Sequence, residues 1–534
     1  MDYLYNPFQT TRHAAFARRG MVATSQPLAA QAGIEIMRRG GNAIDAAIAT
    51  AATLTVVEPT SNGIGGDAFA LVWMKDQLYG LNASGPAPEL LTVEAVKAAG
   101  HEKIPTYGVV PITVPGVPAA WAELSSKFGR LSLLETLEPA IRYAEEGFPL
   151  TPILGKYWEI AYHKFKNACN GSEFEAWFNT FAPNGRAPQT GEIWRSPDHA
   201  KTLHAIGETN ANAFYHGHLA DEIDAFMQQH GGFLRKRDLA NYKVEWVKPL
   251  SVNYKGYDVW EMPPNGQGMI TLMALNIFSE MNSAVPNDVR SLHEQIEAMK
   301  LAFIDGKAFI SEETDMPVSV KTLLSQAYAK RRAAEISERA SIPAPYDLPK
   351  GGTVYLATAD GEGNMVSLIQ SNYMGFGSGV VVPGTGIALQ NRAVDFSLEP
   401  DHPNVLKSGK RSYNTIIPGF LSKDGQAIGP FGIMGGFMQP QGHFQVIINT
   451  LDYQLNPQAT LDAPRWQWVK ENVVHVEPNF PNHLAQALTR LGHQVVPTLD
   501  SGSFGRGQII WRNPATGVLS GGTESRTDGA IAVW

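Results

Sequence analysis

The sequence SIPAPYDLPKGG at residues 341–352 constrains the fold of this chain more than any other segment. Its three prolines and two glycines exclude a regular helix or strand, so the segment predicts a linker. Two strand-like runs follow, Thr353–Ala359 and Met365–Ser371, and the sequence DGEGN between them predicts a tight turn. A shorter part of the chain, rich in predicted strands, therefore begins after Gly352.

Composition narrows the class of protein. Of the 534 residues, 44% are hydrophobic, which is enough for a large core, but length alone allows one large unit or several smaller ones. Only 18% of residues are charged and the net charge is −8, which gives no sign of a basic surface for nucleic acid. The single cysteine, Cys169, excludes an internal disulfide and lies in no metal-binding pattern.

Targeting segments and common motifs are missing from the sequence. The start of the chain has no apolar leader and no run of about 18 apolar residues occurs, so we expect a cytoplasmic protein without a membrane span. His293-Glu294 fails as a zinc-protease motif because residue 297 is Glu. The glycine-rich residues 63–66 lack the spacing and the preceding strand of a dinucleotide site.

Two alanine-rich helices are predicted near the start. The first covers about residues 27–39, with Ser25 as its candidate N-cap. The second begins at Asn42, with Asp45 three residues later as in a capping box. Small residues on most faces of this second helix predict that it packs closely inside the protein.

Strands and further helices follow. Strand-like sequence occurs at residues 69–74 and again from Leu78, after a polar turn. Residues 115–345 have mostly helical character, which is clearest at 291–303. Residues 165–200 are polar and aromatic without periodicity, and the sequence does not place them.

Thr353 is notable because it opens the strand that follows the linker. If the Gly352–Thr353 bond is cut, one residue carries both a hydroxyl and an α-amino group. An α-amine has a pKa of roughly 7.7–8.0, so it can take the proton of its own hydroxyl near neutral pH without a histidine. The preceding glycines give the backbone the freedom that an N-to-O acyl shift requires. Position and composition alone favour the simpler interpretation, a β-branched residue at the start of an ordinary strand.

Gly435 and Gly436 stand between a strand-like and a helix-like run. Adjacent backbone N–H groups at such a junction can point at a developing oxyanion. A strand-to-helix turn that simply needs glycine explains the pair equally well.

Arg392 and Asp395 follow a predicted strand at Ile387–Leu389. Two opposite charges at the end of a strand can bind a zwitterionic head group. They can also form a solvated surface pair, which is the commoner case.

Several long segments, in a fixed order from about residue 20 to the C-terminus, resemble the γ-glutamyltransferase (glutathione hydrolase) family of N-terminal-nucleophile hydrolases. They are GMVATSQPLAAQAGIEIMRRGGNAIDAAIA near the start, NGIGGDAF at 62–69, TVYLATADGEGNMVS at 353–367, FGSG at 376–379, GIALQNRAVDFS at 386–397 and MGG at 434–436. The details are most similar to non-secreted bacterial glutathione hydrolase-like proenzymes.

The resemblance implies an α+β fold, an αββα sandwich in which two antiparallel sheets lie between helical layers. It implies a precursor that cuts itself into a large chain, 1–352, and a small chain, 353–534. The two chains are expected to stay associated as one structural unit, with no nucleic-acid or membrane partner.

The same match implies roles for individual residues. Thr353 takes the position of the nucleophile, and Ser371 replaces a threonine that positions it. Gly435 and Gly436 match the oxyanion pair, and Asp395 matches the aspartate that holds the substrate α-amino group. The implied chemistry passes an acyl group from a small-molecule amide donor through an ester to water or an amine, with no cofactor and no metal.

The predicted head-group pocket departs from the family pattern. The family's arginine for the substrate α-carboxylate falls near Asn82, and an asparagine falls on Tyr373. A glutamine becomes Arg392, and a paired serine motif becomes Asn414-Thr415. These residues, with Asp395, are the predicted substrate-binding set.

Three functions remain open from the sequence. The first is a γ-glutamyl hydrolase or transferase. The second is an acylase of the same fold that acts on another acyl amide, as cephalosporin and glutaryl acylases do. The third is an inactive scaffold that binds a small acid. The altered pocket favours the second and third, whereas the intact Thr353 and glycine pair argue against the third.

Overall fold

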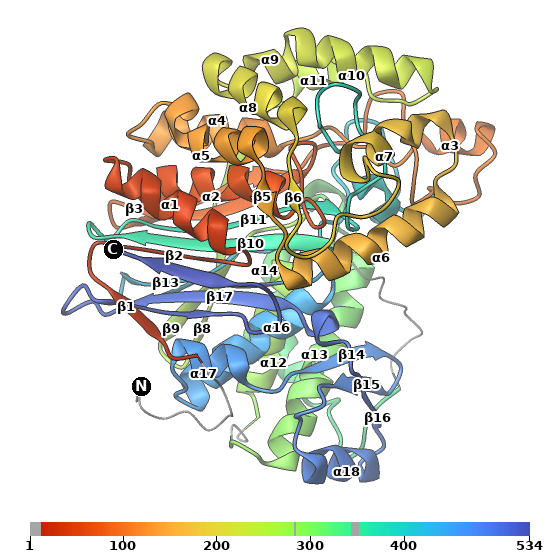
Figure 1. Cartoon of the computed structure of the whole chain (residues 1–534). Helices are drawn as coiled ribbons and strands as arrows, with labels where there is room; N and C mark the ends of the chain where they lie inside the picture. Colours follow the sequence, from red (N-terminus) through yellow and green to blue (C-terminus); the bar gives the residue numbers. More distant parts are fainter. Residues whose placement is uncertain (1–11, 282–284, 343–351) are drawn as a thin grey trace.

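Two seven-stranded sheets pack face to face, with helices on both outer sides (Figure 1). This computed structural model describes residues 12–281, 285–342 and 352–534, so the predicted linker falls mostly outside the described residues. Every strand pair within the two sheets is antiparallel. The predicted αββα sandwich is therefore confirmed.

The first sheet has the strand order β19-β2-β10-β11-β3-β4-β7. Its strands are β2 (Gly20–Thr24), β3 (Asp67–Met74), β4 (Gln77–Ala83), β7 (Glu245–Val247), β10 (Gly352–Asp360), β11 (Met365–Tyr373) and β19 (Ala530–Val533). The second sheet has the order β1-β18-β17-β13-β12-β9-β8. Its strands are β1 (Ala15–Ala17), β8 (Leu250–Tyr254), β9 (Tyr257–Glu261), β12 (Gly419–Lys423), β13 (Gln426–Met434), β17 (Arg506–Arg512) and β18 (Leu519–Thr523).

Both sheets mix strands from before and after the Gly352–Thr353 bond. In the first sheet β10 lies between β2 and β11, and β11 pairs with β3. In the second sheet β12 pairs with β9. A cut at this bond, which stays a prediction, would leave the two pieces hydrogen-bonded to each other across both sheets.

The upper helical layer begins with α1 (Pro27–Arg38) and α2 (Ala43–Val57). Every residue of α2 is buried, which fits its alanine-rich sequence, and the capping box of Asn42 and Asp45 is present as predicted. The predicted N-cap of α1 is wrong by one residue. Gln26 accepts from Leu28 N–H there, because the Ser25 hydroxyl is engaged by Glu58 instead.

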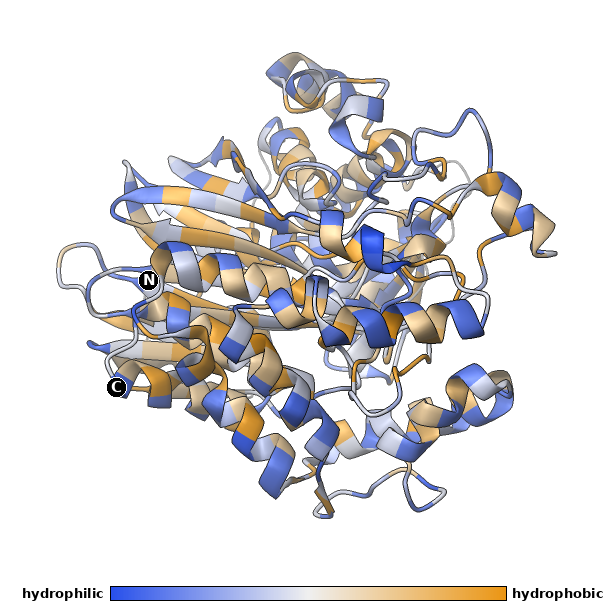
Figure 2. Ribbon diagram, turned by 90° about the horizontal axis from the view of Figure 1, so that it is seen from above, coloured by the Kyte–Doolittle hydropathy of each residue, from blue (hydrophilic) through white to orange (hydrophobic). Residues whose placement is uncertain are grey.

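The lower layer contains α12 (Gly268–Ser279), α13 (Val289–Phe309), α16 (Met438–Ile447) and α17 (Pro457–Asp462) (Figure 1). The predicted helix at 291–303 is the middle of α13. In Figure 2 the central strands are largely hydrophobic, whereas the long peripheral helices alternate between hydrophobic and hydrophilic colours. This is the pattern of helices that bury one side against a sheet.

The segment that the sequence could not place is organised by aromatic packing. It contains the end of α6 (Pro152–Ala168), α7 (Glu175–Phe181), β6 (Ile193–Trp194) and the start of α8 (Pro197–Thr209). Trp177 and Phe181 pack around Phe376, with ring centres 5.1 and 4.6 Å from it. These contacts join residues far apart in the sequence, so no local periodicity predicts them.

Ile387–Leu389 does not form the predicted strand; Ala388 and Leu389 make only isolated bridges, to Val381 and Gly65.

Across the three described ranges, no helix combines the length and apolar character needed to cross a membrane.

Candidate active site

Thr353 lies in β10 where the strand pairing is irregular. Gly352 pairs with Tyr373 of β11, but Val354 pairs with Gln370, so a bulge falls at the junction. A bulge interrupts the hydrogen-bond ladder and re-aims the side chain beside it. Thr353 is only 1% exposed, so its hydroxyl is held inside the protein.

Three oxygen atoms meet at the Gly352–Thr353 bond. Thr353 Oγ1 lies 2.7 Å from the carbonyl oxygen of Gly352 and 3.2 Å from Ser371 Oγ. Ser371 Oγ donates to the same carbonyl at 2.6 Å and accepts from the backbone N–H of Tyr373 at 2.8 Å. Two hydroxyls therefore contact the carbonyl of the bond that the sequence predicts to be cut.

Gly435 and Gly436 form the turn between β13 and α16. Their φ angles are +133° and +59°, which other residues adopt only with strain. Buried Gln267, which the sequence did not single out, fixes this turn because its Nε2 donates to Gly436 O at 2.9 Å and to Thr415 O at 2.6 Å. Gly352 and Gly435 line one cavity of about 280 Å³, so the turn and the predicted scissile bond face the same space.

Arg392 lies in the short helix η3 (Arg392–Asp395) and is 1% exposed. Its Nη1 donates to Thr415 Oγ1 at 2.9 Å, and its guanidinium lies 4.4 Å from the centre of the Tyr373 ring. It faces two carboxylates, with Nε 3.5 Å from Asp67 and Nη1 3.6 Å from Asp395. A solvated surface pair is therefore the wrong interpretation, because strand β3 brings Asp67 over the loop.

A buried network holds the two carboxylates. Asp67 accepts from Gln390 Nε2 at 2.9 Å and from Asn414 Nδ2 at 3.1 Å. Asp395 accepts from the Tyr373 hydroxyl at 2.8 Å. Burial raises the pKa of both carboxyls above the ordinary value, while the nearby cations act in the opposite direction.

Some polar atoms of this network have no hydrogen-bond partner among the described residues. They are Nε and Nη2 of Arg392 and Oδ2 of Asp395, all buried. Buried polar atoms are normally hydrogen-bonded, so such a group marks a place for a ligand or water. Here donors and an acceptor occur together, which suits a ligand that carries a carboxylate and an amine.

Lys307 of α13 adds a second cation that the sequence analysis missed. Its Nζ lies 3.9 Å from the centre of the Tyr413 ring and 4.2 Å from that of Phe437. Burial lowers the pKa of Lys307 to about 8, and its charge acts on Asp395. The sequence does not predict the contacts of Lys307, because they depend on how α13 packs against the later part of the chain.

Apart from the glycine turn at Gly435 and Gly436, most of the predicted site residues fall into two connected groups. Thr353 and Ser371 form one group, and Arg392, Asp395, Tyr373, Asn414 and Thr415 belong to the other. Tyr373 connects the two through its backbone and its hydroxyl. Asn82 is linked to the second group only indirectly: its amide donates to Asn265 Oδ1 at 3.0 Å, and Asn265 O accepts from the backbone N–H of Asn414 at 2.9 Å.

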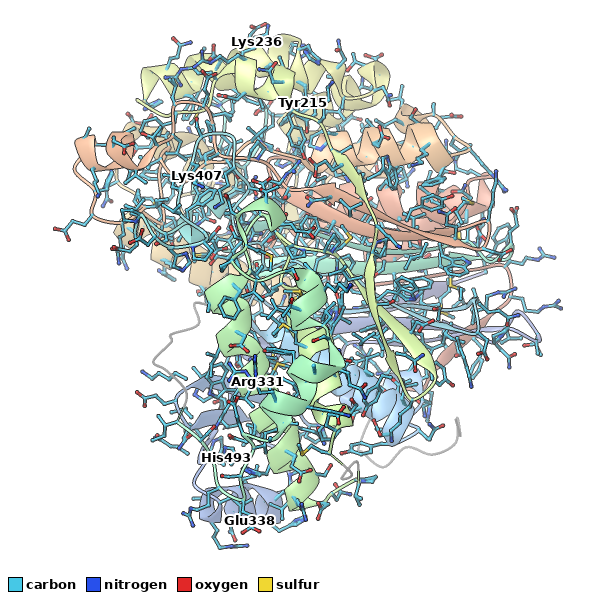
Figure 3. All side chains as sticks on the ribbon, turned by 180° about the vertical axis from the view of Figure 1, so that it is seen from behind. Tyr215, Lys236, Arg331, Glu338, Lys407 and His493 are labelled. Atoms are coloured by element: carbon cyan, nitrogen blue, oxygen red, sulfur yellow. The ribbon has the colours of Figure 1, made fainter. Side chains whose placement is uncertain are left out.

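A possible metal-ligand group lies elsewhere. His293, Glu297 and His493 are the one set of His, Cys, Asp and Glu in the described ranges whose ligand atoms come within 4.8 Å of one another. Lys300 Nζ already lies 2.6 Å from Glu297, and His293 bonds to Ser337 O at 2.9 Å. Figure 3 shows His493 near Glu338, at the opposite end of the molecule from Lys236.

The sequence matches the Gamma-glutamyltranspeptidase family over residues 29–534. It is 35% identical to the glutathione hydrolase-like YwrD proenzyme of Bacillus subtilis, over 96% of this chain and 97% of that one. It is 32% identical to the oxamate amidohydrolase proenzyme of Klebsiella pneumoniae, over 96% and 98%.

Solved structures agree with the sequence relatives. The crystal structure of a cephalosporin acylase from Bacillus halodurans has 62% sequence identity to this chain and a TM-score of 0.96, and the match covers 100% of this chain and 99% of the other. A gamma-glutamyltranspeptidase from Helicobacter pylori has 28% identity and a TM-score of 0.54, over 62% and 94%. With its antiparallel αββα sandwich and its match across nearly the whole sequence, this chain belongs to the Gamma-glutamyltranspeptidase family of hydrolases and transferases.

Proposed function

We propose that this chain is a precursor that cuts its own Gly352–Thr353 bond and then works as an N-terminal threonine hydrolase or acyltransferase. The observation that carries the proposal is the contact of the Thr353 and Ser371 hydroxyls with the Gly352 carbonyl. Attack of Thr353 Oγ1 on that carbonyl carbon breaks the C–N bond, and the hydroxyl proton passes to the nitrogen. Water then cleaves the ester, which leaves a carboxylate on Gly352 and a free α-amine on Thr353.

Turnover uses the same hydroxyl a second time. The Thr353 α-amine takes the hydroxyl proton while Oγ1 attacks the carbonyl carbon of an amide substrate. Gly435 and Gly436 N–H groups stabilise the oxyanion, and such a donor contributes roughly 2.7–4 kcal/mol in a comparable site. The C–N bond then breaks, the amine leaves with the proton, and water or another amine releases the acyl group. The large and small chains stay together throughout.

The acyl group that fits best carries a carboxylate. Arg392 supplies buried donor atoms that have no hydrogen-bond partner among the described residues, and a guanidinium binds a carboxylate through parallel hydrogen bonds. A γ-glutamyl group adds an α-amine, for which Oδ2 of Asp395 is the acceptor at hand. The similarity to a glutathione hydrolase-like proenzyme supports this first candidate.

A glutaryl-type group is the second candidate, because it keeps the carboxylate and lacks the amine. Lys307 already places a positive charge near Asp395, which competes with a substrate ammonium for that carboxylate. The similarity to a cephalosporin acylase supports the same choice.

Two chromogenic donors separate the candidates, since γ-glutamyl-4-nitroanilide and glutaryl-4-nitroanilide differ only in the α-amine. The preferred donor of the processed wild type identifies the acyl group. If the γ-glutamyl donor is preferred, Asp395→Asn should lower its kcat/KM by roughly 10- to 100-fold and leave the glutaryl donor within about threefold. Asp401→Asn, an exposed acid in the same loop, is the matched control. Release of neither anilide contradicts the proposal.

We also place the protein in the cytoplasm. Its single cysteine, Cys169, is a free thiol, and a lone free thiol in a chain of this length fits a reducing compartment. Cell fractionation with an antibody against the small chain tests this placement.

A further inference from the structure

The cavity beside Gly352 and Gly435 is separate from the head-group network. Its wall, as far as the described residues form it, includes Gly352 and Gly435 but none of Arg392, Asp395 and Thr415. An amide whose carbonyl carbon lies at Thr353 extends in two directions, with the acyl group on one side and the amine on the other. If Arg392 anchors the acyl group, the amine needs a second space that reaches the same carbonyl.

Arg506 is the buried cation of this cavity. It is the first residue of β17 and pairs in register with Met434, directly before Gly435. It is 7% exposed, and its guanidinium lies over the Tyr157 ring, 4.4 Å from the ring centre. Its Nε has no hydrogen-bond partner in the described part of the chain, so the cavity holds a buried donor that is ready for an acceptor.

Glu58 is the carboxylate nearest to Arg506, with Oε1 3.5 Å from Nη1. Burial raises the pKa of Glu58 to about 7, so it carries only part of a negative charge at neutral pH. At the rim, Lys164 adds a positive charge, and Asp500 lies 4.0 Å from Lys156. The cavity wall thus carries two cations, Arg506 and Lys164, against one carboxylate, Asp500, which favours an anion, while Asp528 lines a smaller cavity with Glu58 and Arg506.

We infer that this cavity binds the amine half of the substrate and that Arg506 recognises a carboxylate on that amine. The inference rests on the proposed function, because Thr353 must be the nucleophile for Gly352 and Gly435 to mark the reaction centre. The class of leaving group or acceptor is an amine that carries a carboxylate, and Arg506 is a specificity-determining residue.

The test compares two leaving groups on one acyl group, whichever of γ-glutamyl and glutaryl the wild type prefers. The 4-nitroanilide and the 3-carboxy-4-nitroanilide differ only in a carboxylate on the leaving amine. Arg506→Gln should lower kcat/KM for the carboxylated anilide by at least about tenfold and change that of the plain anilide by less than about threefold. Arg506→Lys should keep part of the preference, and Arg512→Gln, on the same strand, should change neither donor.

Turnover of the plain anilide reports folding, processing and catalysis, so a general defect is visible in every variant. Equal loss on both anilides, or no loss on either, overturns the inference and leaves the proposed function intact. Calorimetric titration with 5-amino-2-nitrobenzoate measures the same contact without turnover. Its binding to processed wild type should weaken by about tenfold in Arg506→Gln, and unchanged binding would also overturn the inference. A wild type that cleaves neither anilide but binds this amine through Arg506 points to failure of the proposed function alone.

Discussion

The Tyr373 hydroxyl donates to Oδ1 of Asp395 at 2.8 Å, while its backbone N–H donates to Ser371 Oγ at 2.8 Å. The residue has a φ angle of +76°, a backbone conformation that a bulky side chain rarely adopts. Such strain persists only where the surroundings impose it. Tyr373 therefore ties the hydroxyls at the predicted scissile bond to the carboxylate of the head-group network, so the two parts of the site keep a fixed relation.

Removal of the Thr353 hydroxyl should block processing. Thr353→Ala should remain a single chain of 534 residues, whereas the wild type should give chains 1–352 and 353–534. Thr353→Ser keeps a hydroxyl and should retain part of both processing and turnover. Denaturing gels with N-terminal sequencing of the small chain check this. A small chain that starts at any other residue contradicts the assignment.

Loss of the Ser371 hydroxyl should slow self-cleavage. Its hydroxyl donates to the Gly352 carbonyl, so Ser371→Ala should slow chain cleavage on the order of 100-fold by removing a donor from the developing oxyanion. Ser371→Thr restores the family's residue and is the matched control, with cleavage close to the wild-type rate. The measurement is the fraction of cut chain against time after synthesis. Equal rates for alanine and threonine variants would assign Ser371 no role.

Loss of the Arg392 charge should weaken the binding of acidic acyl donors. Arg392→Gln, which restores the family's residue, should weaken a carboxylated acyl donor by roughly 1.5–3 kcal/mol, mainly through KM. An uncharged acyl amide should change little, because it makes no ion pair with the guanidinium. Steady-state kinetics on both donors check this. If both respond equally, Arg392 is structural and the carboxylate anchor lies elsewhere.

Binding of an acid should weaken as Lys307 loses its proton. The pKa of Lys307 is lowered to about 8, so the charge is present below this pH and is lost as the pH rises through it. Asp395, Tyr413 and Phe437 face this ammonium, and His402 stays neutral across the window because burial lowers its pKa.

Inhibition by glutarate measures this loss. Its inhibition constant should rise by roughly three- to tenfold between about pH 7 and 9.5 in the wild type. Lys307→Arg should flatten the rise, because arginine keeps its charge over this range. The Thr353 α-amine titrates in both proteins, so their difference isolates residue 307. Parallel profiles for the two proteins would show that Lys307 does not act on the bound acid.

The sequence by itself determined the elements whose cause is local. The all-round alanine pattern and capping box of α2, the β10–β11 hairpin across DGEGN and the glycine turn at Gly435-Gly436 all follow from short-range rules. The family resemblance added the sandwich and the candidate nucleophile. Neither source placed Lys307 of α13 or Gln267, directly before α12, because nothing in the sequence around either residue indicates the distant groups that it contacts.

Tertiary structure decided the burial and the partners of the charged side chains in the site. Arg392 and Asp395 looked like a surface pair because a sequence does not say which strand will cover a loop. Packing of β3 and α13 places Asp67 and Lys307 against this pair and removes it from water. The result is a buried ionic network in which some donors and one acceptor have no hydrogen-bond partner among the described residues. Burial depends on contacts between distant segments, and so the chemistry of these same side chains is set by the fold.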